Sequence, residues 1–278
     1  MANPRETQAD PTGSSTGRFD DTSTRGTGSR LSANTTFVDR ELGEWYPPVI
    51  IGPATVGGRA TSAGCVRRVI DVLRALEPDD YTRYLLGYYE AGLARFGDDW
   101  RYADITTILL AAAELAKPKD YLEIGVRRGR SMAMVASAAS DCAVVGFDLW
   151  EAGYAGMDNP GPDFVRTQMS ALGHKGKLEL ISGDSRTTVP AYFESHPDAC
   201  FDLITVDGDH TKRGAAQDLR AVGPRLRVGG ILVFDDIVHP QHPYLAEVWR
   251  RQVISDESFA CWSFTELGYG VAIAVRKE

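Results

Sequence analysis

The sequence lacks the features that several classes of protein require. Its four cysteines are widely scattered and fit neither a disulfide framework nor a zinc knuckle. The most apolar stretch, residues 105–116, is too short to span a bilayer. The N-terminus has no succession of basic, apolar and small residues of the kind that forms a signal peptide. We therefore expect a reduced, cytoplasmic protein with no membrane partner.

Positive charge is also scarce. The 30 Lys and Arg residues are outnumbered by 38 Asp and Glu residues, which leaves a net charge of −8 at pH 7. Binding to the phosphates of nucleic acids needs a surplus of Lys and Arg, so we expect no nucleic-acid partner. Hydrophobic residues make up 43% of the chain, which is enough to form a core of useful size.

The composition divides the first part of the chain into two segments. Residues 1–38 are rich in Ser, Thr, Gly, Asp and Arg, and they predict a disordered tail because they bury too little apolar surface to offset ordering entropy. Residues 39–117 predict an N-terminal loop and helical cap. Within it, the aromatics and helix breakers of residues 41–62 indicate an irregular ordered loop, and helical periods follow up to residue 117.

Residues 118–278 alternate short apolar runs with helical stretches, which predicts βαβ units and an α/β fold. The expected architecture is a doubly wound, Rossmann-like sheet that is mostly parallel. Its last two strand-like runs, 259–264 and 269–275, are separated by a hairpin-length loop, so they are expected to be antiparallel. Such a C-terminal antiparallel hairpin is typical of the methyltransferase version of this fold and argues against the six-parallel-strand dinucleotide fold.

The first predicted strand leads into Glu123-x-Gly125-x-x-x-Gly129-x-Ser131. Gly125 permits a tight turn, and Gly129 permits a close backbone approach where a helix begins. Free amides at that point can bind an anionic group. Glu123 is placed to accept bonds from loop amides or from a cofactor ammonium. The glycine spacing differs from the dinucleotide motif, which disfavours NAD; the alternative is a generic strand-to-helix turn that binds nothing.

Acidic residues also follow the second and third predicted strands. Asp148 comes 25 residues after Glu123, where an acid can accept both ribose hydroxyls of an adenosine, or can cap a helix. Asp184 and Ser185 are expected beside an adenine edge. Asp184 accepts there from the exocyclic amine, or instead caps the helix that begins near Arg186. Together with the glycine motif, these residues favour a ligand that contains adenosine.

The fourth and fifth predicted strands end in two carboxylate clusters, which contain Asp207 in the first and Asp235 and Asp236 in the second. Like charges so close together repel, so either some point to solvent or a hard divalent cation holds them. Mg²⁺ prefers such oxygen ligands and keeps positions for a substrate diol. His210, three residues after Asp207, is the best candidate for a general base because its ordinary pKa suits proton abstraction near neutral pH.

Three segments of the chain resemble a known family of methyltransferases: Glu123–Ser131, Val206–His210 and Gly229–Ile237. The family includes macrocin and other macrolide-sugar O-methyltransferases, aminocoumarin sugar O-methyltransferases and cephalosporin-hydroxylase-like proteins. The resemblance covers residues 118–278 and implies a class I methyltransferase that uses S-adenosyl-L-methionine (SAM). It further implies a Mg²⁺ ion held by Asp207, Asp235 and Asp236, with Asp207 and His210 as the catalytic residues.

The expected reaction is methyl transfer to a hydroxyl of a small molecule, a sugar or another natural-product intermediate. A metal-independent methyltransferase of the same fold and a non-catalytic SAM-binding scaffold are the alternatives. The segment 148–162 is longer than a compact connection and forms either a lid or inert surface packing. A homodimer is one way to cover the aromatic N-terminal segment, although nothing in the sequence fixes the stoichiometry.

Overall fold

The structure, a computed structural model, describes residues 37–39, 43–45, 51–153 and 156–278. Most of the predicted tail lies outside these residues. Strand β1 (Phe37–Asp39) pairs in antiparallel fashion with β2 (Gly43–Trp45). In the described part of the chain, no helix combines the length and the apolar character that a membrane crossing needs.

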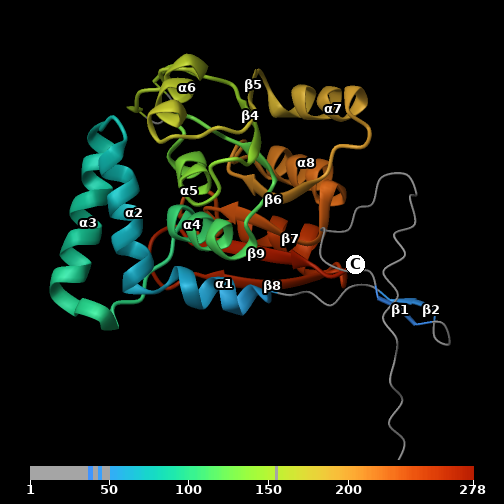
Figure 1. Cartoon of the computed structure of the whole chain (residues 1–278), viewed down its shortest axis with the longest axis horizontal. Helices are drawn as coiled ribbons and strands as arrows, with labels where there is room; N and C mark the ends of the chain where they lie inside the picture. The colour runs from blue at the N-terminus through green and yellow to red at the C-terminus, as the bar shows by residue number, and fades with distance from the viewer. Residues whose placement is uncertain (1–36, 40–42, 46–50, 154–155) are drawn as a thin grey trace, which may run out of the picture.

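A seven-stranded sheet with the order β5-β4-β3-β6-β7-β9-β8 forms the centre of the molecule (Figure 1). The strands from β5 to β7 are parallel, and β9 runs antiparallel to both β7 and β8. This confirms the predicted fold class, including the C-terminal hairpin. The strands are β3 (Asp120–Ile124), β4 (Ala143–Asp148), β5 (Leu178–Ser182), β6 (Phe201–Val206), β7 (Leu226–Asp235), β8 (Phe259–Phe264) and β9 (Val271–Arg276).

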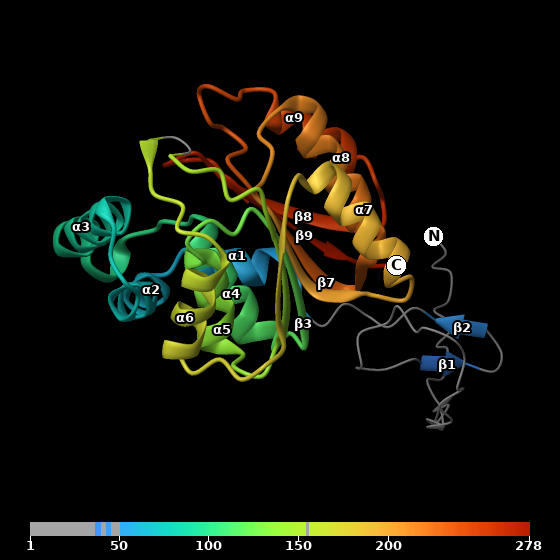
Figure 2. The same ribbon diagram turned by 90° about the horizontal axis from the view of Figure 1, so that it is seen from above.

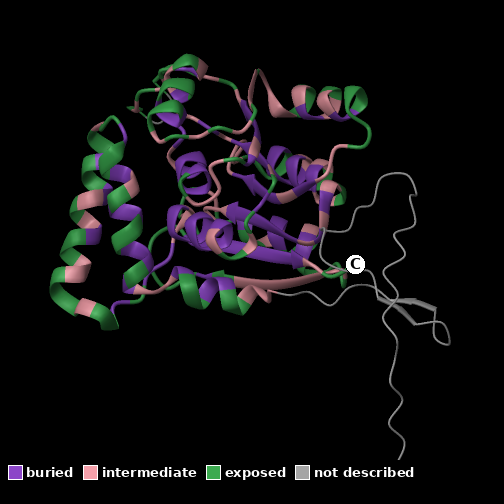
Figure 3. Ribbon diagram, viewed as in Figure 1, coloured by how far each residue is buried: buried purple, intermediate pink, exposed green. Residues whose placement is uncertain are grey.

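Helices cover both faces of the sheet (Figure 2). One face carries α1 (Pro53–Ala60), α4 (Ile105–Ala116), α5 (Arg130–Ala138) and α6 (Pro162–Ala171), and the other carries α7 (Ser185–Ser195), α8 (Lys212–Val222) and α9 (Leu245–Trp249), which continues as a π-helical turn (Arg250–Ile254). Alternate residues along each strand point to opposite faces of the sheet and pack into two separate cores. Tyr121 lies in one core and Leu122 in the other. Both residues are fully buried, as are most residues of the central strands (Figure 3).

Helices α2 (Ala63–Ala75) and α3 (Asp80–Phe96) form a hairpin, and most of its buried residues belong to the same core as Tyr121 (Figure 1). The α2 helix buries its apolar stripe, whereas α3 exposes much of its surface (Figure 3). The turn between them ends at Asp79, whose carboxylate accepts a hydrogen bond from the Thr82 amide at 2.8 Å and so caps α3. The predicted boundary at residue 117 stays a prediction; the helix just before it, α4, packs on the sheet.

The prediction of an irregular loop over residues 41–62 is wrong in part, because residues 53–60 form helix α1 (Pro53–Ala60). Pro53 stands in its first turn, where proline is well tolerated. A Cβ at Gly57 would overlap the indole ring of Trp262 on β8, so this glycine permits close packing of helix on strand. Of the glycines in this segment, Gly57 therefore serves helix packing. The rest of that segment up to residue 50 is described only at 43–45.

Candidate active site

The loop between β3 and α5, residues 125–129, is called the glycine loop and lies where the strand order of the sheet changes direction. From β3 the chain continues to β4 and β5 on one side of this point, and it then crosses to β6 and β7 on the other side. Ligands of such sheets bind at the carboxyl ends of the strands near this point. Gly125 (φ 92°) and Gly129 (φ 75°) both adopt left-handed conformations. A Cβ at Gly125 would collide with the carbonyl oxygen of Asp207, so this glycine lets the ends of β3 and β6 meet.

Glu123 and Ser131 lie beneath the glycine loop and contact each other. Glu123 is completely buried, and the Ser131 hydroxyl donates a hydrogen bond to its carboxylate. The hydroxyl of Tyr121 lies 3.1 Å from the other carboxylate oxygen. Burial raises the pKa of Glu123 to about 8 even though these two hydrogen bonds lower it. Both residues therefore support the loop from inside the core, and their predicted contact with a cofactor stays a prediction.

Asp148, at the end of β4, joins the glycine loop to the segment after it. One carboxylate oxygen accepts a hydrogen bond from the Arg127 amide at 2.7 Å. The other accepts from the Trp150 amide at 2.6 Å and from the Asn159 side chain at 3.5 Å. A carboxylate has about four lone-pair sites, so Asp148 keeps about one for a ribose hydroxyl, and the predicted contact with both hydroxyls stays a prediction.

Asp184 and Ser185 stand at the start of α7. Asp184 accepts a hydrogen bond from the Arg186 amide at 2.9 Å and pairs with its guanidinium, and the hydrogen bonds from Arg186 lower the pKa of Asp184. The Ser185 hydroxyl donates to the buried carboxylate of Asp218 at 3.2 Å. The helix cap considered as an alternative for Asp184 is thus present, and the adenine contact stays a prediction.

Asp207, His210 and Asp236 meet at the ends of β6 and β7. The Nε2 atom of His210 lies 3.2 Å from Asp207 Oδ1 and 3.4 Å from Asp236 Oδ2. Each residue offers one ligand atom, and these atoms all lie within 4.8 Å of one another. Asp236 reaches this position with a left-handed backbone (φ 61°), which is unusual for a residue with a side chain.

Asp235 is not part of this triad, although the sequence predicts it as a metal ligand together with Asp207 and Asp236. The last residues of β7 alternate between the two cores, and Asp235 continues the face of Ile231 and Val233, toward α4. Burial, and then the charges of Asp207 and Asp236, hold the pKa of Asp235 well above its ordinary value. Its carboxylate is thus near enough to feel the cluster, and its role as a ligand stays a prediction.

The electrostatics of the triad fit a bound cation. Burial and the charge of Asp207 raise the pKa of Asp236 to about 7, with His210 acting in the opposite direction. Burial lowers the pKa of His210, but its hydrogen bond with Asp207 and the charges of Asp207 and Asp236 outweigh this and raise it. Two carboxylates that are costly to keep ionised side by side, around one nitrogen donor, form a suitable ligand set for a divalent ion.

Further histidines extend the site outward. The ring of His242 stacks on that of His210 with centroids 5.3 Å apart, and Tyr244 donates a hydrogen bond to the His210 carbonyl at 2.9 Å. His239 packs against Tyr269, with centroids 4.1 Å apart. The contacts of His242 and Tyr244 hold the loop that carries His210, and no pattern in the sequence singles out His242.

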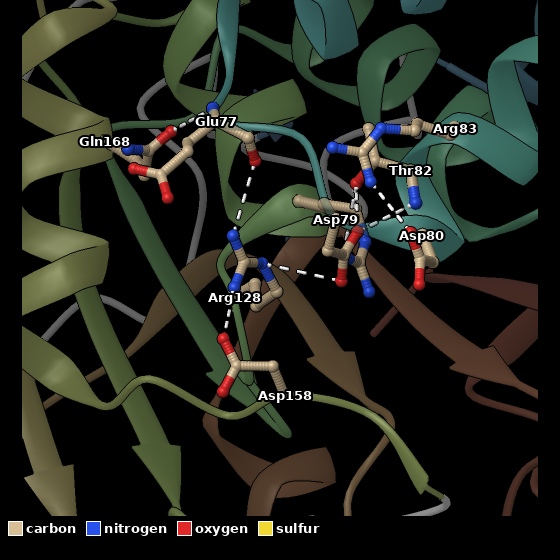
Figure 4. A network of polar contacts seen from close by, with 9 residues as sticks. Glu77, Asp79, Asp80, Thr82, Arg83, Arg128, Asp158 and Gln168 are labelled. Atoms are coloured by element: carbon tan, nitrogen blue, oxygen red, sulfur yellow. Dashed lines mark hydrogen bonds and ion pairs between the residues drawn. The ribbon is translucent and has the colours of Figure 1, made fainter.

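Sequence reasoning also missed an ion-pair network that ties α3 to the glycine loop (Figure 4). Arg128 is 5% exposed; its guanidinium lies 2.8 Å from Asp158 and 3.5 Å from Asp79. Arg130 pairs with Asp79 at 3.1 Å. The sequence does show three arginines close together in the segment 125–130, but the acidic partners of Arg128 and Arg130 are distant in sequence.

Comparisons with known proteins bear on the domain and its fold. Residues 122–237 match the sequence profile of a methyltransferase domain. No curated protein sequence matches the chain.

Among solved structures, the calicheamicin methyltransferase CalS11 is 20% identical, with a TM-score of 0.50, and the match covers 82% of this chain and 95% of that one. The O-methyltransferase TomG of Streptomyces achromogenes, involved in tomaymycin synthesis and solved with SAM, is 20% identical with a TM-score of 0.51, over 73% and 92% of the two chains. An O-methyltransferase of Bacillus cereus, solved with S-adenosylhomocysteine (SAH), is 16% identical with a TM-score of 0.51, over 77% and 91%. These likenesses show a shared fold.

Proposed function

We propose that the chain, whose residues 122–237 match the sequence profile of a methyltransferase domain, is a SAM-dependent O-methyltransferase that acts on a hydroxyl of a small molecule. The observation that carries this proposal is the meeting of Asp207, His210 and Asp236 beside the glycine loop. A proton acceptor and a pair of metal-binding carboxylates are what activation of a hydroxyl requires. The likeness to calicheamicin methyltransferase and to TomG, which is involved in tomaymycin synthesis, supports a natural-product intermediate as acceptor, and the family resemblance of the sequence motifs supports a sugar.

The glycine loop and Asp148 are the residues proposed to hold SAM, which supplies an electrophilic methyl group when bound. Gly129 places the amide end of α5 at the loop, where an anionic group is stabilised. Asp148 offers its remaining acceptor capacity to the ribose. Glu123 and Ser131 hold the loop from below, and Asp184 and Ser185 lie at the end expected for adenine.

Asp207 and Asp236 are the residues proposed to hold Mg²⁺, with Asp235 as the third ligand that the family resemblance implies. Such an ion would lower the pKa of an acceptor hydroxyl by its charge. The fit rests on the raised pKa of Asp236, because a group that resists ionisation beside Asp207 is stabilised by a compensating cation.

His210 is proposed as the base that takes the proton from the acceptor hydroxyl at Nε2. Burial lowers its pKa, but the hydrogen bond with Asp207 and the charges of Asp207 and Asp236 raise it by more, which favours the imidazolium form that cannot act as a base. A cation that compensated the carboxylates would lower that pKa and favour the neutral ring. The rest of the catalysis comes from alignment and from electrostatic stabilisation at a largely buried site.

A metal-independent transferase is the second candidate, and the same triad favours it. His210 lies within 3.2 and 3.4 Å of the two carboxylates, so a protonated imidazole already balances part of their charge. In that case Asp207 and Asp236 orient the base and bind no ion.

The test is turnover, measured as SAH formation over a panel of sugar hydroxyls and catechol-like diols, with EDTA and with added Mg²⁺. Asp236→Asn is compared with Asp163→Asn, which removes an exposed carboxylate on α6. Activity that EDTA abolishes, Mg²⁺ restores and Asp236→Asn eliminates supports the metal-dependent proposal. Full activity in EDTA supports the metal-independent transferase, and SAM binding without turnover on any acceptor contradicts the proposed reaction.

A further inference from the structure

The residues around Asp148 carry an unusual share of unpaired polar atoms. Among the residues that the structure describes, five buried side-chain nitrogen or oxygen atoms have no hydrogen-bond partner, and four of them belong to Arg127, Trp150 and Asn159. Each of these three residues bonds the Asp148 carboxylate through another of its atoms. A buried donor without a partner costs about 1–3 kcal/mol, so such a concentration indicates groups that are satisfied by a ligand.

Arg127 has the most informative pair of unpaired atoms. They are Nε and Nη2, which form the side of the guanidinium that binds a carboxylate or phosphate through two parallel hydrogen bonds. The Arg127 backbone is left-handed (φ 52°), a conformation that costs energy in a residue with a Cβ and is concentrated at functional sites. Its guanidinium carbon lies 5.6 Å from the centre of the Tyr81 ring.

The charges of the loop single out the same residue. Of the three arginines, Arg128 and Arg130 form ion pairs with Asp79, and Arg128 also pairs with Asp158. Within the described part of the chain, no ion pair involves Arg127. Its charge instead acts on Arg130 and lowers the pKa of that residue, after burial, which means that the two cations repel each other. Arg127 is therefore the one of these three arginines whose guanidinium forms no ion pair within the described residues.

We propose that the Nε–Nη2 edge of Arg127 binds an oxyanion, a carboxylate or a phosphate, of a ligand at the glycine loop. This inference rests on the proposed function, which supplies two sources of such a group. One is the carboxylate of the methyl donor, and the other is an acidic group on the acceptor. Arg127 packs against Tyr81, and its amide donates a hydrogen bond to Asp148, the residue proposed to hold the ribose of the donor, so the edge lies beside the proposed donor site.

The test uses calorimetric titration of the full chain and two substitutions. Arg127→Met removes the charge, and Arg127→Lys keeps the charge but loses the two-donor edge. Arg83→Met is the matched control, because Arg83 is an exposed arginine of α3 that has its own partner, Asp80, at 2.8 Å. The probes are SAH, 5′-methylthioadenosine, which lacks the amino-acid part, and inorganic phosphate and pyrophosphate, each added with and without SAH.

If the donor supplies the oxyanion, Arg127→Met weakens SAH binding by about tenfold or more, Arg127→Lys weakens it less, and 5′-methylthioadenosine binding is unchanged. If the acceptor supplies the oxyanion, Arg127→Met leaves SAH binding unchanged. Phosphate or pyrophosphate then binds the SAH-saturated wild type, and it binds SAH-saturated Arg127→Met at least about tenfold more weakly. Arg83→Met behaves as wild type in both cases. Wild-type binding of SAH together with no change in any probe on Arg127→Met overturns the inference.

Two further readings separate this inference from other causes. Arg127→Met without ligand should keep or raise the melting temperature, because it removes an unpaired buried charge. A clear fall in that temperature, with unchanged affinities, assigns Arg127 a structural role and overturns the inference. Failure of the wild type to bind SAH contradicts the proposed function instead, and the phosphate titrations without SAH then decide the role of Arg127 on their own.

Discussion

The Ser131 hydroxyl donates a hydrogen bond to the Glu123 carboxylate inside the core, beneath the glycine loop. The acid that begins the motif therefore connects the end of β3 to the first turn of α5. Its burial explains why the loop keeps one shape, since a buried polar group held by two hydroxyls fixes the backbone on both sides. The same burial raises the pKa of Glu123, so its protonation state should change the dependence of stability on pH.

Glu123→Gln should become more stable relative to the wild type as the pH rises. The pKa of Glu123 is about 8 in the folded chain against an ordinary value of 4.5, so between these values the folded chain holds a proton that the unfolded chain releases. The stability of the wild type therefore falls as the pH rises through this window, and the uncharged Gln escapes that fall.

Urea unfolding of both proteins at about pH 5 and about pH 9 measures this effect, which should be on the order of a few kcal/mol. Glu194→Gln, at an exposed position, is the control and should show the same pH dependence as the wild type. A difference between Glu123→Gln and wild type that does not change with pH would mean that Glu123 is ionised when folded.

The order of strands and helices could be predicted because it depends on local patterns. Alternating apolar runs and helical periods are properties of neighbouring residues, and in residues 118–278 they predicted the alternation of strands and helices that is observed. The hairpin of β8 and β9 followed from the short loop between them. The start of β7 at Leu226 is harder to predict, because Gly229 and Gly230 interrupt the apolar pattern within the strand.

The site was harder to predict because it depends on where side chains point. The sequence shows that Asp235 and Asp236 follow one strand, but consecutive residues face opposite ways, and only Asp236 reaches His210. The partners of Arg128 lie in segments about 50 and 30 residues away along the chain, and no local pattern connects them. Contacts between distant segments are set by tertiary packing.

Asp79→Asn should destabilise the protein by about 1–3 kcal/mol at neutral pH. Asn still caps α3, so the loss reports the ion pairs with Arg128 and Arg130. Burial opposes ionisation of Asp79, but hydrogen bonds from Thr82 and the charges of the two arginines outweigh it and lower the pKa to about 2. This stabilisation is present above the ordinary value of 3.8 and is lost as the pH falls through 2.

Urea unfolding over a range of pH checks that expectation: the gap between wild type and Asp79→Asn should narrow as the pH falls from about 5 toward 2. Asp80→Asn removes the neighbouring, fully exposed carboxylate and should change stability by less than about 0.5 kcal/mol. Equal effects of the two substitutions would show that the network in Figure 4 adds nothing beyond a surface pair.

Asp236→Asn should weaken Mn²⁺ binding, measured by electron paramagnetic resonance as a probe of the proposed Mg²⁺ site, by about tenfold or more. Asp235→Asn should have a smaller effect because Asp235 lies outside the triad. Asp209→Asn is the control, since the Asp209 carboxylate bonds the Thr211 amide at 2.8 Å, and its effect should be under about threefold. A larger loss in Asp235→Asn than in Asp236→Asn would make Asp235 the principal ligand.

Gly125→Ala should destabilise the protein by at least about 2 kcal/mol. A Cβ there collides with the carbonyl oxygen of Asp207, and the left-handed backbone (φ 92°) adds strain. Gly58→Ala is the matched control, because its Cβ meets no atom and it lies inside α1, where alanine is favoured by about 1 kcal/mol. Urea unfolding checks both, and Mn²⁺ titration shows whether displacing Asp207 also weakens the proposed metal site. Unchanged stability in Gly125→Ala would mean that β3 and β6 can separate at their ends without cost.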